Sequence, residues 1–527
     1  MKLVKGLLLG SAAALAVVGG AEAADLPSKK AVAVNYVKIC DAYGSGFFYI
    51  PGTETCIRLG GYVRAEYQYT PAQATYGVNG TIANNGKPYS ITSVTTASTS
   101  PNATSTTAAN SGGVITQFGS AQDTTGFEMR GRIDVDARTP TDLGTVRTFV
   151  RLRLTNTSGI RNTAIVNGAN YVLLQRSASI LTGTGATANP GINQILAGTG
   201  PTIESALIQW AGFTFGVAPE NYAMMPSFMY HSNPWTGFPN GMNQLSYTAT
   251  FGGGFSATLA IEDMGAQNNA TQVFDRPGSV AAIVGNVRLD QGWGFAAIHG
   301  AVQNNAAPVR LDGSAQVTAT NNIGNGFTVF SASNAVGQAT TTGWAIGSTL
   351  SFKLPMIAAG DQVWFTSNYA HGFIGMIGSA GGLNNVMSTA SDHRLIGGVL
   401  RVDSNIVATG LGNGIDSTNA WNLAGAYVHY WDPKWRSNFT AGYIQMNPPT
   451  VAKGTIWWGK GEVWELAGSL IYSPIRDFDI GLEFQYASMK NQIQNALDLK
   501  NQDWVKVGLP GLSANNWSTK LRAERTF

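Results

Sequence analysis

Residues 127–138 constrain the fold of this chain most, because apolar or small and charged side chains alternate there almost without error. Successive side chains of a β-strand point to opposite faces, so the stretch predicts a strand with one apolar and one ionised face. After a turn at residues 140–144 the alternation resumes through 146–154. A barrel with lipid outside and water inside needs this pattern, whereas few soluble sheets do. The ionised face carries Glu128, Arg130, Arg132, Asp134, Asp136, Arg138, Arg147, Arg151 and Arg153.

The composition agrees with a barrel. Charged residues make up 12% of the chain, where a soluble domain has about a quarter. Beyond the N-terminus, no stretch is apolar enough for a transmembrane helix, and alternation dilutes the apolar signal of a membrane strand. A formal net charge of +3 excludes a nucleic-acid partner recruited by bulk charge. We therefore predict an all-β, transmembrane, antiparallel barrel.

The N-terminus has the three parts of a secretory signal. Lys2 and Lys5 precede an apolar core at residues 7–18, and Ala21-Glu22-Ala23 fits the small-x-small cleavage rule. This core is too short for a spanning helix, and a buried N-terminal helix is the alternative. We expect residues 1–23 to be a cleaved signal peptide, residues 24–56 an N-terminal segment, and residues 57–527 the barrel.

Candidate strands occur in pairs joined by short turns, and long polar stretches separate the pairs. The count is about sixteen, an even number as in bacterial outer-membrane barrels; residues 393–402 could form a strand but are placed in a loop. Short turns are expected on the periplasmic side. Aromatic residues near strand ends, such as Tyr62 and Trp431, are expected in interfacial girdles, with ordinary core or loop positions as the alternative. Long external loops are expected near 70–125, 156–201 and 303–342.

Cys40 and Cys56 are the two cysteines of the chain. Export to an oxidising compartment favours a disulfide between them. It would close a loop of about fifteen residues, worth roughly 3 kcal/mol in the chain-entropy model. A single pair at this spacing lacks the second half of a zinc site. We expect neither a metal nor a cofactor.

From Cys40 onward the sequence resembles the porins of alphaproteobacteria. The resemblance implies a homotrimer of sixteen-stranded barrels in the bacterial outer membrane, in contact with lipid and lipopolysaccharide. It also implies passive diffusion of small hydrophilic solutes and ions, and a sorting signal at the terminal aromatic residue. The long loops are too anonymous for any function to be carried over. The resembling segments are residues 40–56, 57–67, 130–148, 209–216 and 244–250, together with Phe527.

In such porins the third external loop folds inward and narrows the channel, which here corresponds to residues 219–241. Glu220 and His231 are its candidate charged or titratable groups. The charged hairpin would form the opposite pore wall, because fixed arginine charges in a narrow pore influence which ions pass. The alternative is a solvated, salt-bridged face that filters nothing. We expect weak to moderate selectivity, of a sign that the mixed charges leave open.

Enzyme chemistry is not expected. The five histidines are scattered outside any metal motif, and neither a Gly-x-Ser-x-Gly elbow nor a phosphate-binding glycine loop is present. Two functional alternatives remain: a substrate-selective porin with an aromatic slide for sugars, and a surface receptor or adhesin acting through its loops. An exported soluble all-β protein is the contrasting fold.

Overall fold

The computed structural model describes seventeen stretches of the chain. They are residues 38–71, 75–79, 95–97, 114–118, 124–158, 164–166, 169–171, 201–231, 241–263, 281–309, 317–322, 327–332, 337–377, 404–409, 412–447, 456–495 and 512–527. The predicted signal peptide and residues 393–402 lie outside them. In the described part of the chain, no helix is long and apolar enough to cross a membrane.

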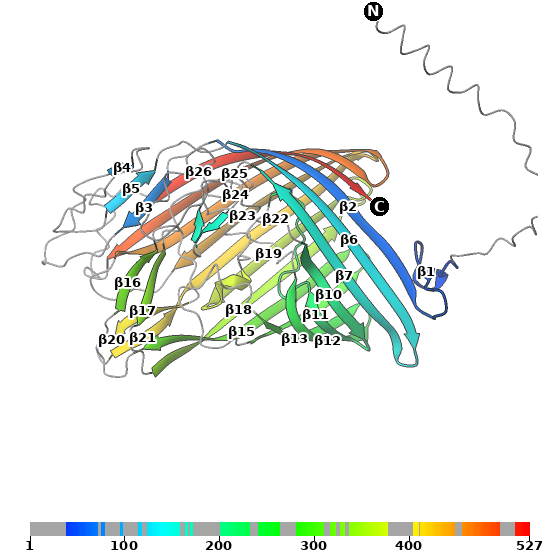
Figure 1. Cartoon of the computed structure of the whole chain (residues 1–527), viewed down its shortest axis with the longest axis horizontal. Coiled ribbons are helices and arrows are strands. Elements are labelled where there is room, and N and C mark those ends of the chain that lie inside the picture. Colours follow the sequence, from blue (N-terminus) through cyan, green and yellow to red (C-terminus); the bar gives the residue numbers. More distant parts are fainter. Residues whose placement is uncertain are drawn as a thin grey trace, which may run out of the picture.

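Sixteen antiparallel strands form a closed barrel, which confirms the predicted fold. Each strand pairs with the next along the chain, and the last pairs with the first. The barrel is elongated, and its strands are tilted relative to its axis (Figure 1). Its strands are β2 (Cys56–Tyr69), β6 (Thr125–Thr141), β7 (Gly144–Thr157), β10 (Thr202–Trp210), β11 (Phe213–Ala218), β12 (Met242–Gly252), β13 (Phe255–Asp263), β14 (Ala281–Gln291), β15 (Gly294–Val309), β18 (Gly337–Lys353), β19 (Gln362–His371), β22 (Asn419–Asp432), β23 (Trp435–Asn447), β24 (Ile456–Ile475), β25 (Phe478–Asn495) and β26 (Leu512–Thr526).

The seam between β2 and β26 closes the barrel, because it leaves neither strand with an open edge. The backbone N–H of Gly61 donates to the carbonyl of Phe527 at 3.2 Å, and the N–H of Phe527 donates back at 3.0 Å. A Cβ on Gly61 would lie 2.0 Å from the backbone oxygen of Arg132 on β6. Glycine is therefore required where three backbones meet.

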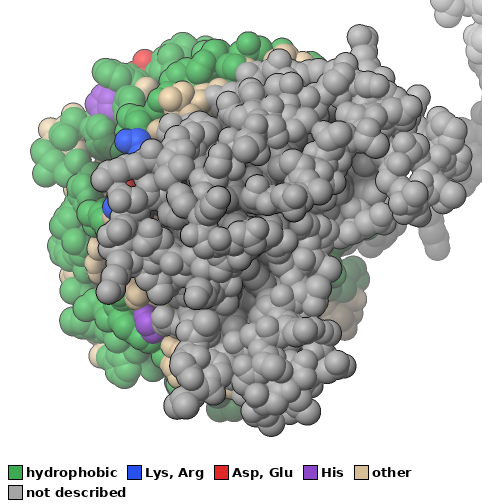
Figure 2. Space-filling model, turned by 90° about the vertical axis from the view of Figure 1, so that its left-hand side faces the viewer, with side chains coloured by type: hydrophobic (Ala, Val, Ile, Leu, Met, Phe, Trp, Pro, Cys, Tyr) green, Lys and Arg blue, Asp and Glu red, His purple; other side chains and the backbone are tan. Residues whose placement is uncertain are grey.

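The two faces of the barrel differ as the alternation predicts. On β2 and β6, Leu59, Val63 and Ile133 are 57, 55 and 47% exposed on the outer face. Between them, Arg64 and Arg132 form ion pairs on the inner face. Viewed from the end that carries the long connections, the visible described side chains around the margin are mostly hydrophobic (Figure 2). Lipid is the solvent that such an outer face requires.

Connections at the two ends of the barrel differ in length. Turns as short as residues 142–143 and 211–212 lie at the end that also holds the disulfide and the C-terminus (Figure 1). The longer turn at 354–361 leads from β18 to β19. Small sheets lie at the opposite end (Figure 1); they are β3 (Thr75–Asn79), β4 (Thr95–Ala97) and β5 (Val114–Phe118), then β16 (Val317–Asn322) with β17 (Phe327–Ala332), and β20 (Ser404–Thr409) with β21 (Gly412–Ser417). A further small hairpin pairs β8 (Ala164–Val166) with β9 (Ala169–Tyr171).

Strands also continue into stretches expected as loops. β15 runs to Val309 and β18 begins at Gly337, within the expected loop 303–342. Beyond the membrane a strand has no lipid-facing side, so its sequence loses the apolar alternation that identifies membrane strands. The sequence pattern therefore marks the membrane-embedded part of a strand and misses its extension.

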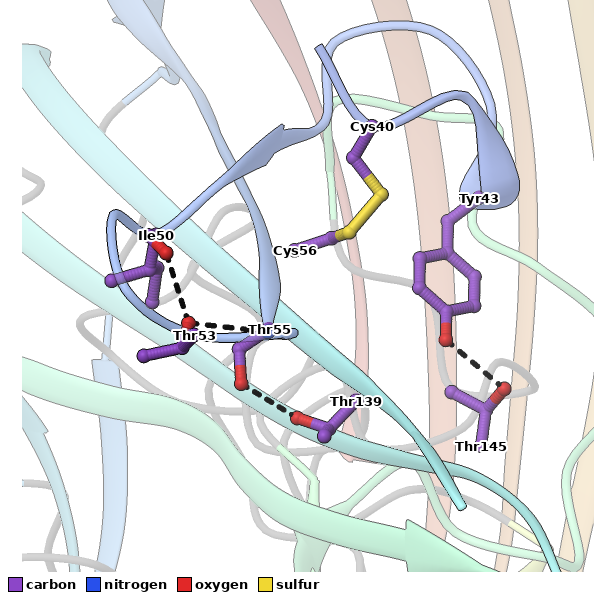
Figure 3. The surroundings of a disulfide bond; sticks show 8 residues. All are labelled: Cys40, Tyr43, Ile50, Thr53, Thr55, Cys56, Thr139 and Thr145. Atoms are coloured by element: carbon purple, nitrogen blue, oxygen red, sulfur yellow. Dashed lines mark hydrogen bonds between the residues drawn. A yellow bond between two sulfur atoms is a disulfide. The ribbon is translucent and has the colours of Figure 1, made fainter. Parts of the chain in front are cut away.

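A disulfide joins Cys40 to Cys56 at the N-terminal end of β2 (Figure 3). It anchors a short segment with the 3-10 helix η1 (Asp41–Tyr43) and β1 (Phe48–Tyr49), which pairs with β2. Phe47 of this segment is 2% exposed and packs with both cysteines. The hydroxyl oxygens of Thr55 and Thr139 lie 2.8 Å apart and tie the segment to β6.

Candidate functional site: an arginine wall and an inward segment

Residues 219–231, here called the inward segment, leave β11 and follow the inner face of the barrel. Near its start, the side-chain amide of Asn221 donates to Glu262 on β13 at 2.8 Å and to Gln244 on β12 at 2.7 Å. The Tyr222 ring packs edge-on against His299 of β15, with centroids 4.4 Å apart. The first residues of the segment are thus fixed to β12, β13 and β15.

Farther along, the inward segment reaches strands on the far side of the barrel. Phe228 packs against Trp364 of β19 with ring centroids 5.4 Å apart, and its carbonyl accepts a 2.7 Å hydrogen bond from Asn438 of β23. The backbone N–H groups of Tyr230 and His231 then donate to the Glu483 carboxylate on β25, at 2.6 and 2.8 Å. The described part of the segment therefore crosses from β11 to β25.

The last described residues of the segment, here called its tip, are held by a row of three side chains. We call this row the latch: His231, Glu483 and Ser518. Nδ1 of His231 hydrogen-bonds to Glu483, and its Nε2 lies 2.7 Å from the Ser518 hydroxyl on β26. Both partners of the His231–Glu483 pair are fully buried, and so is Ser518. Lys520 and Arg522 also donate to the carbonyl of Tyr230, at 3.1 and 3.2 Å.

A second segment fills the lumen beside the first. Phe373 to Ile377, including the 3-10 helix η3 (Ile374–Met376), follows β19, and its apolar side chains are almost fully buried. The amide of Asn422 donates to the carbonyl of Ile377. These residues share one apolar cluster with Tyr222 of the inward segment. The lumen beside β12–β25 is consequently packed with side chains.

The opposite side of the lumen carries what we call the arginine wall. Nine arginines on β2, β6, β7 and β26 form ion pairs with six carboxylates there. The arginines are Arg58, Arg64, Arg130, Arg132, Arg138, Arg147, Arg151, Arg153 and Arg522. The carboxylates are Glu66, Glu128, Asp134, Asp136, Glu204 and Glu524.

Strand register places arginines directly opposite one another three times. The cross-strand pairs are Arg64 with Arg130, Arg132 with Arg153, and Arg138 with Arg147. Like charges in this position destabilise a sheet, although the shared carboxylates reduce the repulsion. Such departures from local rules are characteristic of functional surfaces.

Aromatic rings space the guanidinium groups. The Tyr62 ring lies between Arg64 and Arg132, at 4.7 and 4.3 Å from its centroid. Phe149 lies between Arg147 and Arg151 at 4.9 and 5.2 Å. Cation–π contact of this kind holds a guanidinium in a fixed plane.

Two residues occupy places that the sequence analysis did not foresee. Tyr62 is 4% exposed on the inner face, so its assignment to an interfacial girdle is corrected. The sequence analysis did not place Phe149 on the inner face, because phenylalanine is apolar and such side chains are expected to face lipid. Alternation on β2 could have revealed Arg58 and Arg64, since they alternate with the exposed Leu59 and Val63.

The structure places these predicted site residues in four locations: the arginine wall, the start of the inward segment, the latch and the seam. All nine charged residues of the hairpin lie on the inner face of β6 and β7 within the arginine wall or its carboxylates. Glu220 is half-buried at the start of the inward segment, whereas His231 is closed into the latch and does not face open lumen. Phe527 ends the seam with its side chain 68% exposed.

Within the described stretches, no group of His, Cys, Asp and Glu side chains could hold a metal ion. Among the residues whose burial the structure describes, six tryptophans are exposed: Trp210, Trp293, Trp344, Trp431, Trp435 and Trp517. Trp364 instead turns inward against Phe228 and Phe295. An aromatic slide through the lumen would need several inward tryptophans, and these positions favour a lipid-interface belt instead.

Comparisons with known proteins agree with this architecture. A family model described as "Porin subfamily" matches residues 25–510. Porin Omp2b of Brucella abortus (strain 2308) is 29% identical over 327 residues, which cover 59% of this chain and 69% of the relative. Porin Omp2b of Brucella neotomae is 30% identical with the same coverage. Among solved structures, the outer membrane channel DcaP of Acinetobacter baumannii aligns with 91% of this chain and 99% of its own at 13% identity and a TM-score of 0.48.

The two sequence comparisons, rather than the structural alignment, determine the assignment. They cover most of the chain, and the closed barrel with its charged lumen is the architecture that such a protein requires. The protein is thus located in the outer membrane, where it forms a channel for passive diffusion. The chain belongs to the porin subfamily.

Proposed function

We propose that solutes cross this channel between the inward segment and the arginine wall, and that the wall gives the channel a preference for anions. The nine predicted charged residues of β6 and β7 line this path, and the inward segment narrows it. The observation that carries the proposal is the course of the inward segment, whose described contacts run along β12 to β26. Small hydrophilic solutes would therefore pass beside β2, β6, β7 and β10.

The charge balance of the wall supports the anion preference. Nine guanidiniums face six carboxylates, and arginine stays protonated at any physiological pH. A fixed charge excess on one side of a narrow water-filled path raises the local concentration of the opposite ion. Because all nine arginines form ion pairs, we expect the anion preference to be moderate.

Reversal potentials across a salt gradient test the path. In planar bilayers, Arg130→Gln, Arg132→Gln and Arg151→Gln combined should shift the reversal potential toward cation preference, because they remove three fixed positive charges. Arg288→Gln is the matched control: it removes a lumenal arginine on β14, opposite the wall, that pairs with Asp290. Unchanged conductance and selectivity in the triple variant would exclude a filtering role for the wall.

We also propose a homotrimer, which is typical of this fold, embedded in outer-membrane lipid and lipopolysaccharide through the exposed apolar face. In the same bilayer recordings, current steps should occur in multiples of three. Single unitary steps from purified protein would contradict the trimer while leaving the path intact.

The channel is proposed to be non-enzymatic. The latch has the hydrogen-bond order of a Ser-His-acid triad, with Ser518 bonded to His231 and His231 to Glu483. All three groups are buried, however, and Ser518 lies beneath the segment that supplies the histidine. A nucleophile needs access to a substrate. Ester hydrolysis by the purified protein that is lost in Ser518→Ala would refute this reading.

A further inference from the structure

We infer that the periplasmic end of the arginine wall holds a binding station for small, doubly charged oxyanions, built around Arg58. The inference rests on the proposed path along the wall. It concerns Arg58, Arg138 and Arg147, which surround Asp136 on three neighbouring strands. The station would take solutes that carry two negative charges on oxygen, such as hydrogen phosphate or a short dicarboxylate.

The charges in this cluster are unequal. Strand register sets Arg58 opposite Asp136, and sets Arg138 opposite Arg147. Three guanidiniums therefore share one carboxylate, and Asp136 is almost fully buried beneath them. A compact solute with two negative charges would match the remaining positive charge better than chloride would.

The hydrogen bonds show which guanidinium is available. Arg138 and Arg147 each donate to both oxygens of Asp136 through Nε and Nη2, at 3.0–3.1 Å, and Nη1 of Arg147 donates to Gln209 at 2.8 Å. Arg58 approaches Asp136 only to 3.8 Å, beyond hydrogen-bond length, and its side chain is 48% exposed. Among the described residues, its guanidinium makes no hydrogen bond, so its planar set of donors can meet an oxyanion.

The disulfide segment holds this guanidinium in position. The Phe47 ring lies between Arg58 and Arg138, at 5.1 and 5.0 Å from its centroid, and Tyr43 supports Arg138 at 5.6 Å. Phe47 is itself packed against the Cys40–Cys56 disulfide, which ends two residues before Arg58. A side chain stacked in this way loses little further rotamer freedom on binding, which favours affinity.

The opposite side of the lumen offers a matched comparison. Arg288 on β14 also lies near the periplasmic end and stacks on a phenylalanine, Phe295, at 3.9 Å. Its Nε and Nη2 donate to both oxygens of Asp290 at 2.7 and 2.6 Å, one arginine for one carboxylate. Arg288 thus reproduces the stacking on a phenylalanine, but it is tied to its carboxylate by two hydrogen bonds and, in the part of the chain that the structure describes, has no second arginine on the same carboxylate.

The test is saturable block of chloride current in planar bilayers by added hydrogen phosphate or, separately, succinate. Both anions should reduce the wild-type current in a saturable manner. Arg58→Gln should raise the half-blocking concentration about three- to tenfold, because losing this contact should cost more than losing an exposed ion pair and less than losing a buried, charge-assisted hydrogen bond. Arg288→Gln should leave it unchanged. Block by phosphate alone would narrow the class to tetrahedral oxyanions, and block by succinate alone to dicarboxylates.

Three results would overturn the station. The first is absence of block by either dianion, and the second is an unchanged half-blocking concentration in Arg58→Gln. The third is an equal rise of that concentration in Arg58→Gln and Arg288→Gln, which would indicate a non-specific effect of positive charge in the lumen. If Arg58→Gln does not fold, Arg58→Lys keeps the charge but loses the planar donors and should still weaken block measurably. A selectivity shift in the Arg130, Arg132 and Arg151 variant without dianion block would leave the path intact and reject the station.

Discussion

At the scale of single residues, the barrel depends on a few positions where side-chain size is fixed by a neighbouring backbone. Gly61 lies in the seam between the first and last strands, with the chain terminus bonded to it on one side and β6 on the other. A methyl group there would meet the carbonyl oxygen of Arg132 at 2.0 Å. This oxygen belongs to the backbone of β6, so it cannot move away as the end of a flexible side chain could.

Gly61→Ala is therefore expected to destabilise the folded barrel by at least about 1–3 kcal/mol, the usual cost of overpacking. The measurement is the fraction of folded protein by heat-modifiable gel migration after refolding in detergent. Gly60→Ala is the control, because its methyl group would lie 3.4 Å from the nearest atom, the oxygen of Phe527. Equal folded fractions in the two variants would contradict the argument.

At the scale of elements, the inward segment is attached along its length, and its tip is held by the latch. His231 enters the far wall beside Tyr230, whose ring lies under Arg522. The two ring nitrogens of His231 are bonded to Glu483 and Ser518. Removing the ring would leave a buried carboxylate short of a partner, which costs free energy. The tip should then leave the wall more often.

His231→Ala and Ser518→Ala are expected to increase current fluctuations between open levels, with the larger effect in His231→Ala because it loses both bonds. Single-channel recording measures this directly. His371→Ala serves as control, since this histidine bonds Asn419 at 2.8 Å, away from the inward segment. If His231→Ala gives currents with no more fluctuation than the wild type, the backbone hydrogen bonds from residues 230 and 231 to Glu483 are sufficient to hold the tip.

The turn between β18 and β19 is fastened by a carboxylate. Burial by itself would raise the pKa of Asp361. Hydrogen bonds from the Tyr427 hydroxyl, the His429 ring and the backbone N–H of Tyr430 outweigh burial and hold that pKa below its ordinary value. A carboxyl group with a depressed pKa stabilises the fold above its unfolded-state pKa. This contribution disappears as the pH falls through the lower, folded-state pKa.

Acid should therefore weaken the wild-type barrel more than Asp361→Asn. We expect the heat-unfolding temperature in detergent to fall below about pH 4, and the fall to be smaller in the variant. Asp432→Asn is the control, because Asp432 caps the exposed turn at 433–434 through backbone N–H groups. If the heat-unfolding temperature falls equally with pH in the wild type and in Asp361→Asn, Asp361 does not account for the loss of stability in acid.

At the scale of the whole molecule, alternation predicted the barrel and the inner face of β6 and β7, and the spacing of short turns predicted about sixteen strands. The disulfide was predicted separately, from two cysteines in a chain with an export signal. The latch could not be predicted, because His231, Glu483 and Ser518 come from segments up to 287 residues apart. Residues 373–377 were missed for a related reason. Their side chains are apolar, and nothing local distinguishes packing against the inside of a barrel from packing against lipid.

The half-filled lumen has a consequence for the kind of molecule that passes. Tyr222 and Phe373–Ile377 occupy the β12–β25 side, so we expect the free cross-section to be a crescent along the arginine wall instead of a disc. A crescent admits flat or rod-like molecules more readily than spherical ones of equal volume. Permeation rates in a series of uncharged solutes should therefore rank with the narrowest molecular dimension, and molecular mass alone should predict them poorly.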